Sequence, residues 1–160
     1  MSVTEVSSAF SHGGTSDGSA SSLARAFLER MGAHDVEGAL QLVEPQATVD
    51  LVPLKLQGPA AEVGRCYLEE LVRAFPDLQV HVKRLFVGSD GTAVAEVVVE
   101  GVQAADFFGV VNQEKHMDLD QVWLLHVEAG RIDRVRAYWC QNRLYRRLGV
   151  KRLDRVSIIA

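Results

Sequence analysis

The chain has 160 residues, of which 48% are hydrophobic, and its formal net charge is −4 at pH 7. That length and composition suit one domain with a core large enough to fold without disulfides or metals. The negative charge argues against general nucleic-acid binding, which requires a basic face that neutralises several phosphates. The basic residues near the C-terminus are accounted for equally well by a solvated helix face.

The two cysteines, Cys66 and Cys140, are far apart and have neither CxxC nor Cys/His metal-ligand spacing. We therefore expect no disulfide and no zinc site, and free thiols fit a reducing, cytoplasmic setting. No apolar run approaches the length of a membrane span, and the N-terminus lacks the order of a signal peptide. No nucleotide-binding motif is present either, so the sequence predicts no metal, no cofactor and no membrane contact.

The first part of the chain predicts a tail followed by a helical hairpin. Residues 1–21 are mostly Ser, Gly and other small residues, which offer little to bury, so we expect a disordered tail. Apolar residues at helical spacing predict a helix from Ser22, its N-cap, to Gly32. A second helix is expected from Asp35 to just before Pro45.

The rest of the chain predicts one more helix and five strands. The β-branched alternation in "ATVDLV" predicts a first strand over residues 47–52, and apolar periodicity predicts a third helix over residues 60–75. Strand-like segments separated by turns follow in "LQVHVKRLFVG", "AVAEVVVEG", "HMDLDQVWLLHV" and "IDRVRAYWC".

The order of these elements, α-α-β-α-β-β-β-β, predicts an α+β domain over residues 22–150. A curved antiparallel sheet is expected to wrap around the N-terminal helices as a cone. Residues 151–160 follow as a C-terminal extension. Because helices close such a sheet on one side, it leaves a concave, mostly apolar cavity of the kind in which small ligands bind.

Three blocks of sequence carry a family resemblance. "HDVEGALQLVEPQATVD" resembles the second helix and first strand of ketosteroid isomerases, "LVRAFPDLQVHV" a helix-to-strand junction of SnoaL-like polyketide cyclases, and "AGRIDRVRAYW" the last hairpin of both. The chain thus resembles the nuclear transport factor two-like superfamily, and within it these two groups. That superfamily includes enzymes, binding modules and transport factors, so the fold does not settle the function.

The isomerase resemblance implies a carboxylate base and two oxyanion-hole donors, a tyrosine and a carboxylic acid. Counting without gaps places these positions at Leu51, Phe27 and Val122, which are all apolar. A proton shuttle needs a titratable group and an oxyanion hole needs donors, so we do not expect the isomerase mechanism. Asp50 would replace the base only if a bulge turned it inward.

The cyclase resemblance implies an acid/base aspartate after the aromatic pair of the last strand, assisted by a histidine on the preceding strand. Cys140 occupies the aspartate position, whereas His126 matches the histidine. A nucleophilic role for Cys140 would need a lowered pKa and a nearby base, and free cysteines are more often small buried hydrophobes.

The isomerase-like position at Val122 suggests which face of the last hairpin lines the cavity, namely the face that carries Val122. If Val127 pairs with Ile132 and the pairing continues regularly, His126 shares the cavity face with Trp139. We expect His126 to be the acid/base group, assisted by Asp50 or Asp120. The alternatives are a histidine bonded to Asp133 and an exposed carboxylate at Asp120. The other expected substrate-binding side chains are Trp139, Val122, Leu124, Phe27, Leu51, Tyr67, Phe107, Phe108 and Cys140.

Two functions from different classes remain. The first is a SnoaL-like cyclase or isomerase of bacterial secondary metabolism that acts by acid/base catalysis on an apolar, polyketide-type molecule. The alternative is a non-catalytic member that binds a small molecule or a partner; a redox enzyme with an anionic cofactor is a third reading. Trp123 and Leu125 are expected on the outer sheet face, where apolar residues favour a homodimer.

Overall fold

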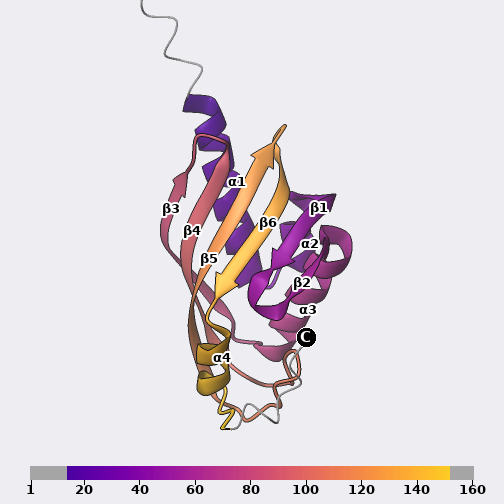
Figure 1. The fold of residues 1–160 in the computed structure, drawn as a ribbon, viewed down its shortest axis with the longest axis vertical. Helices are drawn as coiled ribbons and strands as arrows, with labels where there is room; N and C mark the ends of the chain where they lie inside the picture. The colour runs from indigo at the N-terminus through magenta and orange to yellow at the C-terminus, as the bar shows by residue number, and fades with distance from the viewer. Residues whose placement is uncertain (1–13, 152–160) are drawn as a thin grey trace, which may run out of the picture.

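One curved six-stranded sheet organises the fold, with the strand order β2-β1-β6-β5-β4-β3 (Figure 1). The computed structural model describes residues 14–151. The strands are β1 (Val43–Leu51), β2 (Leu56–Pro59), β3 (Gln79–Val87), β4 (Thr92–Val102), β5 (His116–Glu128) and β6 (Arg131–Trp139). Neighbouring strands are antiparallel except β1 and β6, which are parallel.

The helices are α1 (Gly14–Gly32), α2 (Val36–Gln41), α3 (Arg65–Ala74) and α4 (Gln141–Arg147), with short helical turns η1 (Val52–Leu54) and η2 (Ala60–Gly64). The first three lie behind the sheet in Figure 1, whereas α4 follows the end of β6 at the lower end of the sheet. α1 runs behind the sheet in Figure 1 and contacts β3, β4, β5 and β6. We call the face that packs against α1 the inner face, and the face turned toward the viewer in Figure 1 the outer face. The expected α+β arrangement is confirmed.

Some element boundaries differ from the expected ones. α1 begins at Gly14, inside the stretch expected to be a tail, whereas residues 1–13 and 152–160 lie outside the described residues. β1 starts at Val43, and Pro45 lies where its pairing with β6 is interrupted, so the missing N–H of proline costs no ladder hydrogen bond. None of the helices in the described part is long and apolar enough to cross a membrane.

Local chemistry explains the helices that shape the site. The Asp35 side chain accepts a hydrogen bond from the Gly38 N–H at 2.9 Å and so caps α2. α3 buries Tyr67, Leu68 and Leu71 on one face, as its apolar periodicity predicts. This face of α3 delivers the Tyr67 ring to the interior.

A β-bulge in the β5–β6 hairpin decides which side chains face inward. Val127 pairs with Ile132, as expected, but His126 pairs with Arg134, so Asp133 is an extra residue on β6. Every pair farther from the turn is therefore shifted by one residue relative to the regular register, and Trp123 lies opposite Ala137.

The observed faces of β5 differ from the expected ones. Trp123 and Leu125 are buried on the inner face, whereas Val122, Leu124 and His126 point to the outer face. The expected faces are wrong because the isomerase-like position at Val122, from which the cavity face was inferred, points to the outer face. The bulge places Trp139 opposite Gln121, so Trp139 shares the inner face with Trp123 and not, as expected, a face with His126.

Candidate functional site

A small apolar cavity lies between the inner face and the helices. Its volume is about 20 Å³, which is room for about one water molecule. Phe27, Leu51 and Tyr67, all expected to bind substrate, line it together with Trp123. The remaining lining residues are Leu40, Val43, Val49, Ala60, Gly64, Leu68 and Val135. Side chains therefore fill most of the interior of the cone.

Aromatic rings surround Tyr67. Its ring stacks on Phe108, with centroids 6.1 Å apart, and on Trp139, with centroids 5.9 Å apart. Trp123 and Phe107 contact it at tilted angles, with centroid distances of 6.0 and 6.4 Å. Such pairs add to the stability that burial alone provides. Trp139, Phe107 and Phe108, three further expected pocket residues, thus gather around the same side chain.

The Tyr67 hydroxyl has a buried polar partner, Gln121. The Trp123 indole N–H donates to Gln121 Oε1 at 2.8 Å. Because an indole N–H can only donate, this bond assigns the amide oxygen of Gln121. Burial raises the pKa of Tyr67, and the hydrogen bond from Gln121 opposes that effect in part. The phenol is therefore neutral near pH 7.

A tight turn presses two phenylalanines against Tyr67. Phe107 and Val110 exchange backbone hydrogen bonds of 3.0 and 2.9 Å. Phe108 has φ +43° and Gly109 has φ +82°, and a left-handed conformation is uncommon for a bulky residue. Phe107 is buried and Phe108 is half-buried. The turn holds Phe108 in a strained conformation over the Tyr67 ring.

The expected catalytic side chains lie on the outer face. Asp50 and His126 line one open groove of about 430 Å³, together with Leu124 and two arginines. The Arg136 Nε donates to Asp50 at 3.0 Å. Asp120, Val122 and Cys140 line a separate outer depression, and Cys140 is exposed. The sheet separates both groups from the cavity beside Tyr67, so no bulge turns Asp50 or Cys140 inward.

His126 is bonded at both ring nitrogens. Nδ1 lies 2.5 Å from Asp133 Oδ1, and Nε2 lies 3.0 Å from the Asp90 backbone oxygen. The hydrogen bond to Asp133 raises the pKa of His126, although burial opposes this effect in part. As an imidazolium, the ring donates at both positions and has no lone pair with which to accept a proton. The contact with Asp133 is the alternative that the sequence left open.

Comparison with known proteins identifies the family. Residues 21–148 match the family of SnoaL-like polyketide cyclases. The chain belongs to this family. The structure resembles AclR from Streptomyces galilaeus (20% identity, TM-score 0.72, covering 82% of this chain and 96% of AclR). It also resembles TsrD from Streptomyces laurentii (20% identity, TM-score 0.72, covering 83% and 96%).

A third similar structure is SalBIII, described as an epoxide hydrolase/cyclase-like enzyme in pyran ring formation in polyether salinomycin. It is 16% identical, with a TM-score of 0.67 and coverage of 78% of this chain and 93% of SalBIII. At these identities the likeness concerns the fold. No curated protein matches the chain.

The cavity of this SnoaL-like domain differs chemically from the one expected. Among residues 14–151, no carboxylate, histidine or cysteine lines it, and Tyr67 is the titratable group present. The expectations did not include Gln121, although its alternation with Trp123 on one strand was a usable signal once the inner face was known. The surface of this cavity is apolar, and among the described residues that line it there is no side chain that could act as a base near neutral pH.

Proposed function

We propose that this chain is a cyclase or isomerase of polyketide-type secondary metabolism that polarises a substrate carbonyl with Tyr67. The observation that carries the proposal is the buried, neutral Tyr67 side chain, which lies in otherwise apolar surroundings beside the Trp123–Gln121 pair. A donor aimed at an oxygen that gains negative charge stabilises the transition state, most strongly where water is excluded. The family of the chain and the description of SalBIII support ring closure as the reaction class.

Binding requires the cavity to open, because about 20 Å³ cannot hold a bicyclic molecule. In this proposal the Phe107–Val110 turn moves and the Phe108 ring leaves Tyr67. The strain stored at Phe108, about 1–3 kcal/mol for such a backbone conformation, lowers the cost of that movement. The substrate then takes the place of Phe108 against the Tyr67 ring.

The acid/base roles of His126, Asp50 and Asp120 stay predictions. Any such role would apply to a ligand on the outer face, where these three side chains lie. The proposed reaction uses none of them, because they lie across the sheet from Tyr67. Orientation in the cavity and carbonyl polarisation supply the rate enhancement, and water or the substrate itself accepts the proton.

Matched ligands test the carbonyl contact. We expect α-tetralone, a bicyclic ketone, to bind at least as tightly as tetralin, the hydrocarbon with the same rings. Without a donor in the cavity, burying the carbonyl would cost about 1–3 kcal/mol and tetralin would bind more tightly. Quenching of tryptophan fluorescence measures both affinities, since Trp123 and Trp139 contact Tyr67. Clearly tighter binding of tetralin would contradict the proposal.

A non-catalytic binding protein is the second candidate. It is favoured by the lack of a carboxylate, histidine or cysteine among the described residues that line the cavity. Exchange of the α-hydrogens of α-tetralone in deuterated water, followed by NMR, separates the candidates. Faster exchange with the protein than without it indicates a polarised carbonyl and hence the enzyme. Binding without accelerated exchange indicates the binding protein.

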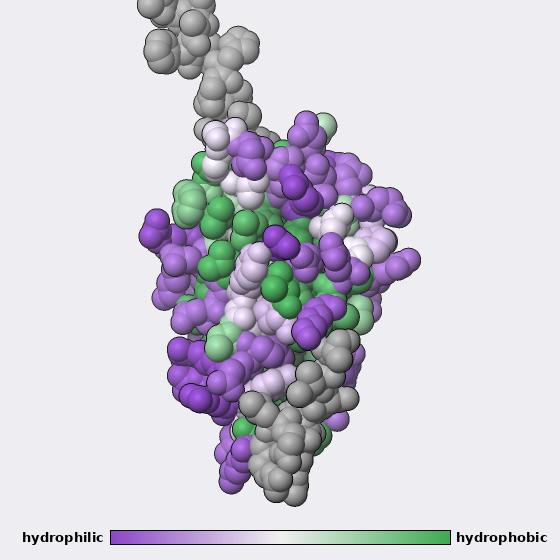
Figure 2. Space-filling model, in the orientation of Figure 1, coloured by the Kyte–Doolittle hydropathy of each residue, from purple (hydrophilic) through white to green (hydrophobic). Residues whose placement is uncertain are grey.

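The outer face is the proposed dimer interface, although through residues other than those expected. Phe86 and Tyr138 are 50% and 39% exposed, and half-buried Val94, Val122 and Leu124 connect them across neighbouring strands. Figure 2 shows hydrophobic side chains gathered on this face inside a hydrophilic rim. A patch of this kind, covered by its copy around a two-fold axis, removes apolar surface from water.

A double charge substitution tests the interface. We expect Phe86→Asp combined with Tyr138→Asp to convert a dimer into a folded monomer, because two carboxylates per chain would be buried without partners. Val111→Asp is the matched control, since Val111 is 65% exposed but lies outside the sheet. Light scattering coupled to size exclusion gives the mass. A monomeric parent chain, or a dimer that survives the double substitution, would show the proposed interface to be wrong.

A reducing, cytoplasmic setting is part of the proposal. Cys66 and Cys140 are both exposed and free of disulfides. Exposed free thiols persist where glutathione and thioredoxin keep cysteines reduced.

A further inference from the structure

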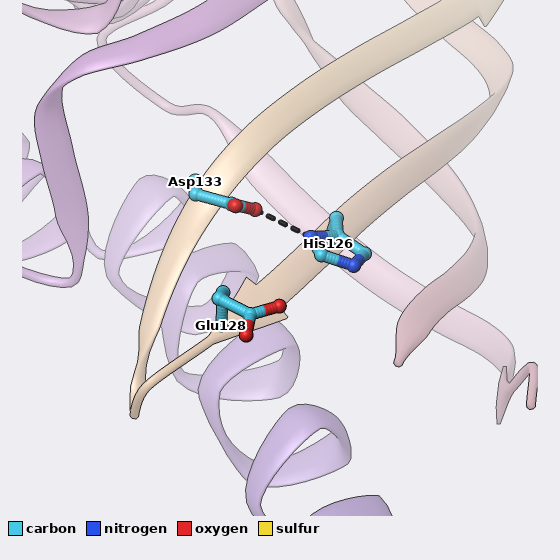
Figure 3. Close-up of side chains that lie close together, drawn as sticks. All are labelled: His126, Glu128 and Asp133. Atoms are coloured by element: carbon cyan, nitrogen blue, oxygen red, sulfur yellow. Dashed lines mark hydrogen bonds and ion pairs between the residues drawn. The ribbon is translucent and has the colours of Figure 1, made fainter. Parts of the chain in front are cut away.

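Three potential metal ligands meet at the end of the β5–β6 hairpin, outside the cavity. They are His126 and Glu128 on β5 and Asp133 on β6, and one donor atom from each lies within 4.8 Å of the others. Figure 3 shows the Asp133 carboxylate directed at the His126 ring, with Glu128 beside them. The side chains of His126 and Asp133 are 13% and 37% exposed. A water-accessible cluster of one imidazole and two carboxylates is thus held on one rigid hairpin.

The orientation of the His126 ring suits a metal ligand. Nε2 lies 3.0 Å from the backbone oxygen of Asp90, which can only accept, so Nε2 carries a hydrogen. In the neutral ring the lone pair is then on Nδ1, which is directed at Asp133. Metal-binding histidines are commonly fixed in this way, with the other ring N–H donated to a backbone carbonyl. The Asp90 contact therefore selects the tautomer that presents Nδ1.

The contact between His126 and Asp133 needs a positive species. Nδ1 and Oδ1 are 2.5 Å apart, and without a cation two acceptors would face each other. A proton satisfies this one pair. It does not satisfy Glu128, whose carboxylate lies within 4.8 Å of the other donor atoms and adds a second negative charge. A divalent ion would satisfy all three groups.

The bulge places Asp133 in this cluster. Asp133 is the extra residue on β6, between the pairs Val127–Ile132 and His126–Arg134. In a regular ladder this position would have a pairing partner and a fixed side-chain direction, whereas a bulge re-aims the side chain. Bulges are over-represented near functional sites.

We propose that His126 Nδ1 and the carboxylates of Asp133 and Glu128 form a binding site for a borderline divalent transition metal, with Zn²⁺ as the representative ion. The nitrogen donor disfavours Ca²⁺ and Mg²⁺, which prefer oxygen ligands only. Metal–ligand distances of about 2.0–2.2 Å require His126 Nδ1 and the Asp133 oxygen, now 2.5 Å apart, to separate around the ion, and the exposed Glu128 side chain to adjust to it. A bound ion would join the hairpin to the β3–β4 turn through Asp90. The site is independent of the function proposed for the cavity.

Calorimetric titration of the full, chelator-treated chain with ZnCl2 tests the site. We expect one ion per chain, and Glu128→Gln and Asp133→Asn should each weaken binding at least about tenfold, the lower end of the loss seen on removing supporting groups of metal sites. His116→Ala is the matched control, because His116 is an exposed histidine beside another carboxylate, Glu100. Thermal unfolding of each variant without metal shows whether it is folded. If Asp133→Asn does not fold, Glu128→Gln still tests the site.

Binding that is absent, that is unchanged in Glu128→Gln, or that is lost in His116→Ala would overturn the proposal. One-site binding that Glu128→Gln weakens and His116→Ala leaves unchanged would support it. A rise in the unfolding temperature on adding Zn²⁺, seen in the parent chain and reduced in Glu128→Gln, is the second expected result.

Discussion

Tyr67→Phe is expected to reduce the protein-dependent α-hydrogen exchange of α-tetralone by about 10²- to 10³-fold, the loss typical of removing one oxyanion donor. The substitution removes the hydroxyl and keeps the ring that packs between Phe108 and Trp139. It should also weaken α-tetralone binding by about 0.5–1.5 kcal/mol, the net value of a neutral hydrogen bond, and leave tetralin binding almost unchanged. Exchange rates by NMR and affinities by fluorescence measure the two effects.

The control for this substitution is Tyr138→Phe, which removes a hydroxyl on the outer face. It should change neither the exchange rate nor the affinities. If Tyr67→Phe weakens both ligands equally, the hydroxyl shapes the cavity but does not contact the carbonyl. Unchanged exchange in Tyr67→Phe would exclude Tyr67 as the polarising group, whatever the affinities show.

The sequence predicts the cone fold well in segments where the apolar residues recur at a single spacing, that of a helix or that of a strand. In α3 the helical line through Tyr67 and Leu71 continues to Phe75, and all three side chains are buried. The strands after Pro76 are separated by turns with Gly in the left-handed conformation at Gly91 and Gly130. In these segments propensity, periodicity and turn chemistry agree, so that the element order follows directly from the sequence.

The face of β5 could not be predicted in the same way. Residues 122–125 are apolar in both alternating phases, so periodicity does not show whether Val122 or Trp123 faces inward. The decision then depended on the isomerase-like position at Val122, which points to the outer face in the structure. The bulge at Asp133 also breaks the regular hairpin register, so Trp139 and His126 lie on opposite faces.

The expected site residues divide between the two faces of the sheet, and their roles stay predictions. Phe27, Leu51 and Tyr67 do lie around one cavity, because their faces follow from regular elements. His126, chosen because it matches a family position, lies across the sheet from them. Matching residues to family positions, without knowing the observed β5–β6 register, grouped His126 with side chains on the other face of the sheet, so these groups cannot contact one substrate.

Trp123→Ala is expected to lower the free energy of unfolding by about 3–5 kcal/mol, the range for removing a large aromatic side chain from a core. Trp123 is 1% exposed, contacts the rings of Phe27 and Tyr67, and donates its indole N–H to Gln121. Its loss therefore leaves a cavity and also removes the partner of a buried amide oxygen. Had Trp123 been on the outer face, as the sequence-based assignment of the Val122 face to the cavity predicts, the cost would be within about 0.5 kcal/mol.

Urea unfolding followed by circular dichroism measures this difference. With a slope of about 2 kcal/mol per molar urea, the expected loss lowers the midpoint by about 2 M. Tyr138→Ala is the matched control, since Tyr138 is an aromatic residue of the neighbouring strand on the outer face, and its midpoint should move far less. Trp123→Phe separates the two causes, because it keeps most of the volume and loses the N–H. A larger loss for Tyr138→Ala than for Trp123→Ala would contradict the bulged register, and with it the assignment of Gln121 and Tyr67 to one buried site.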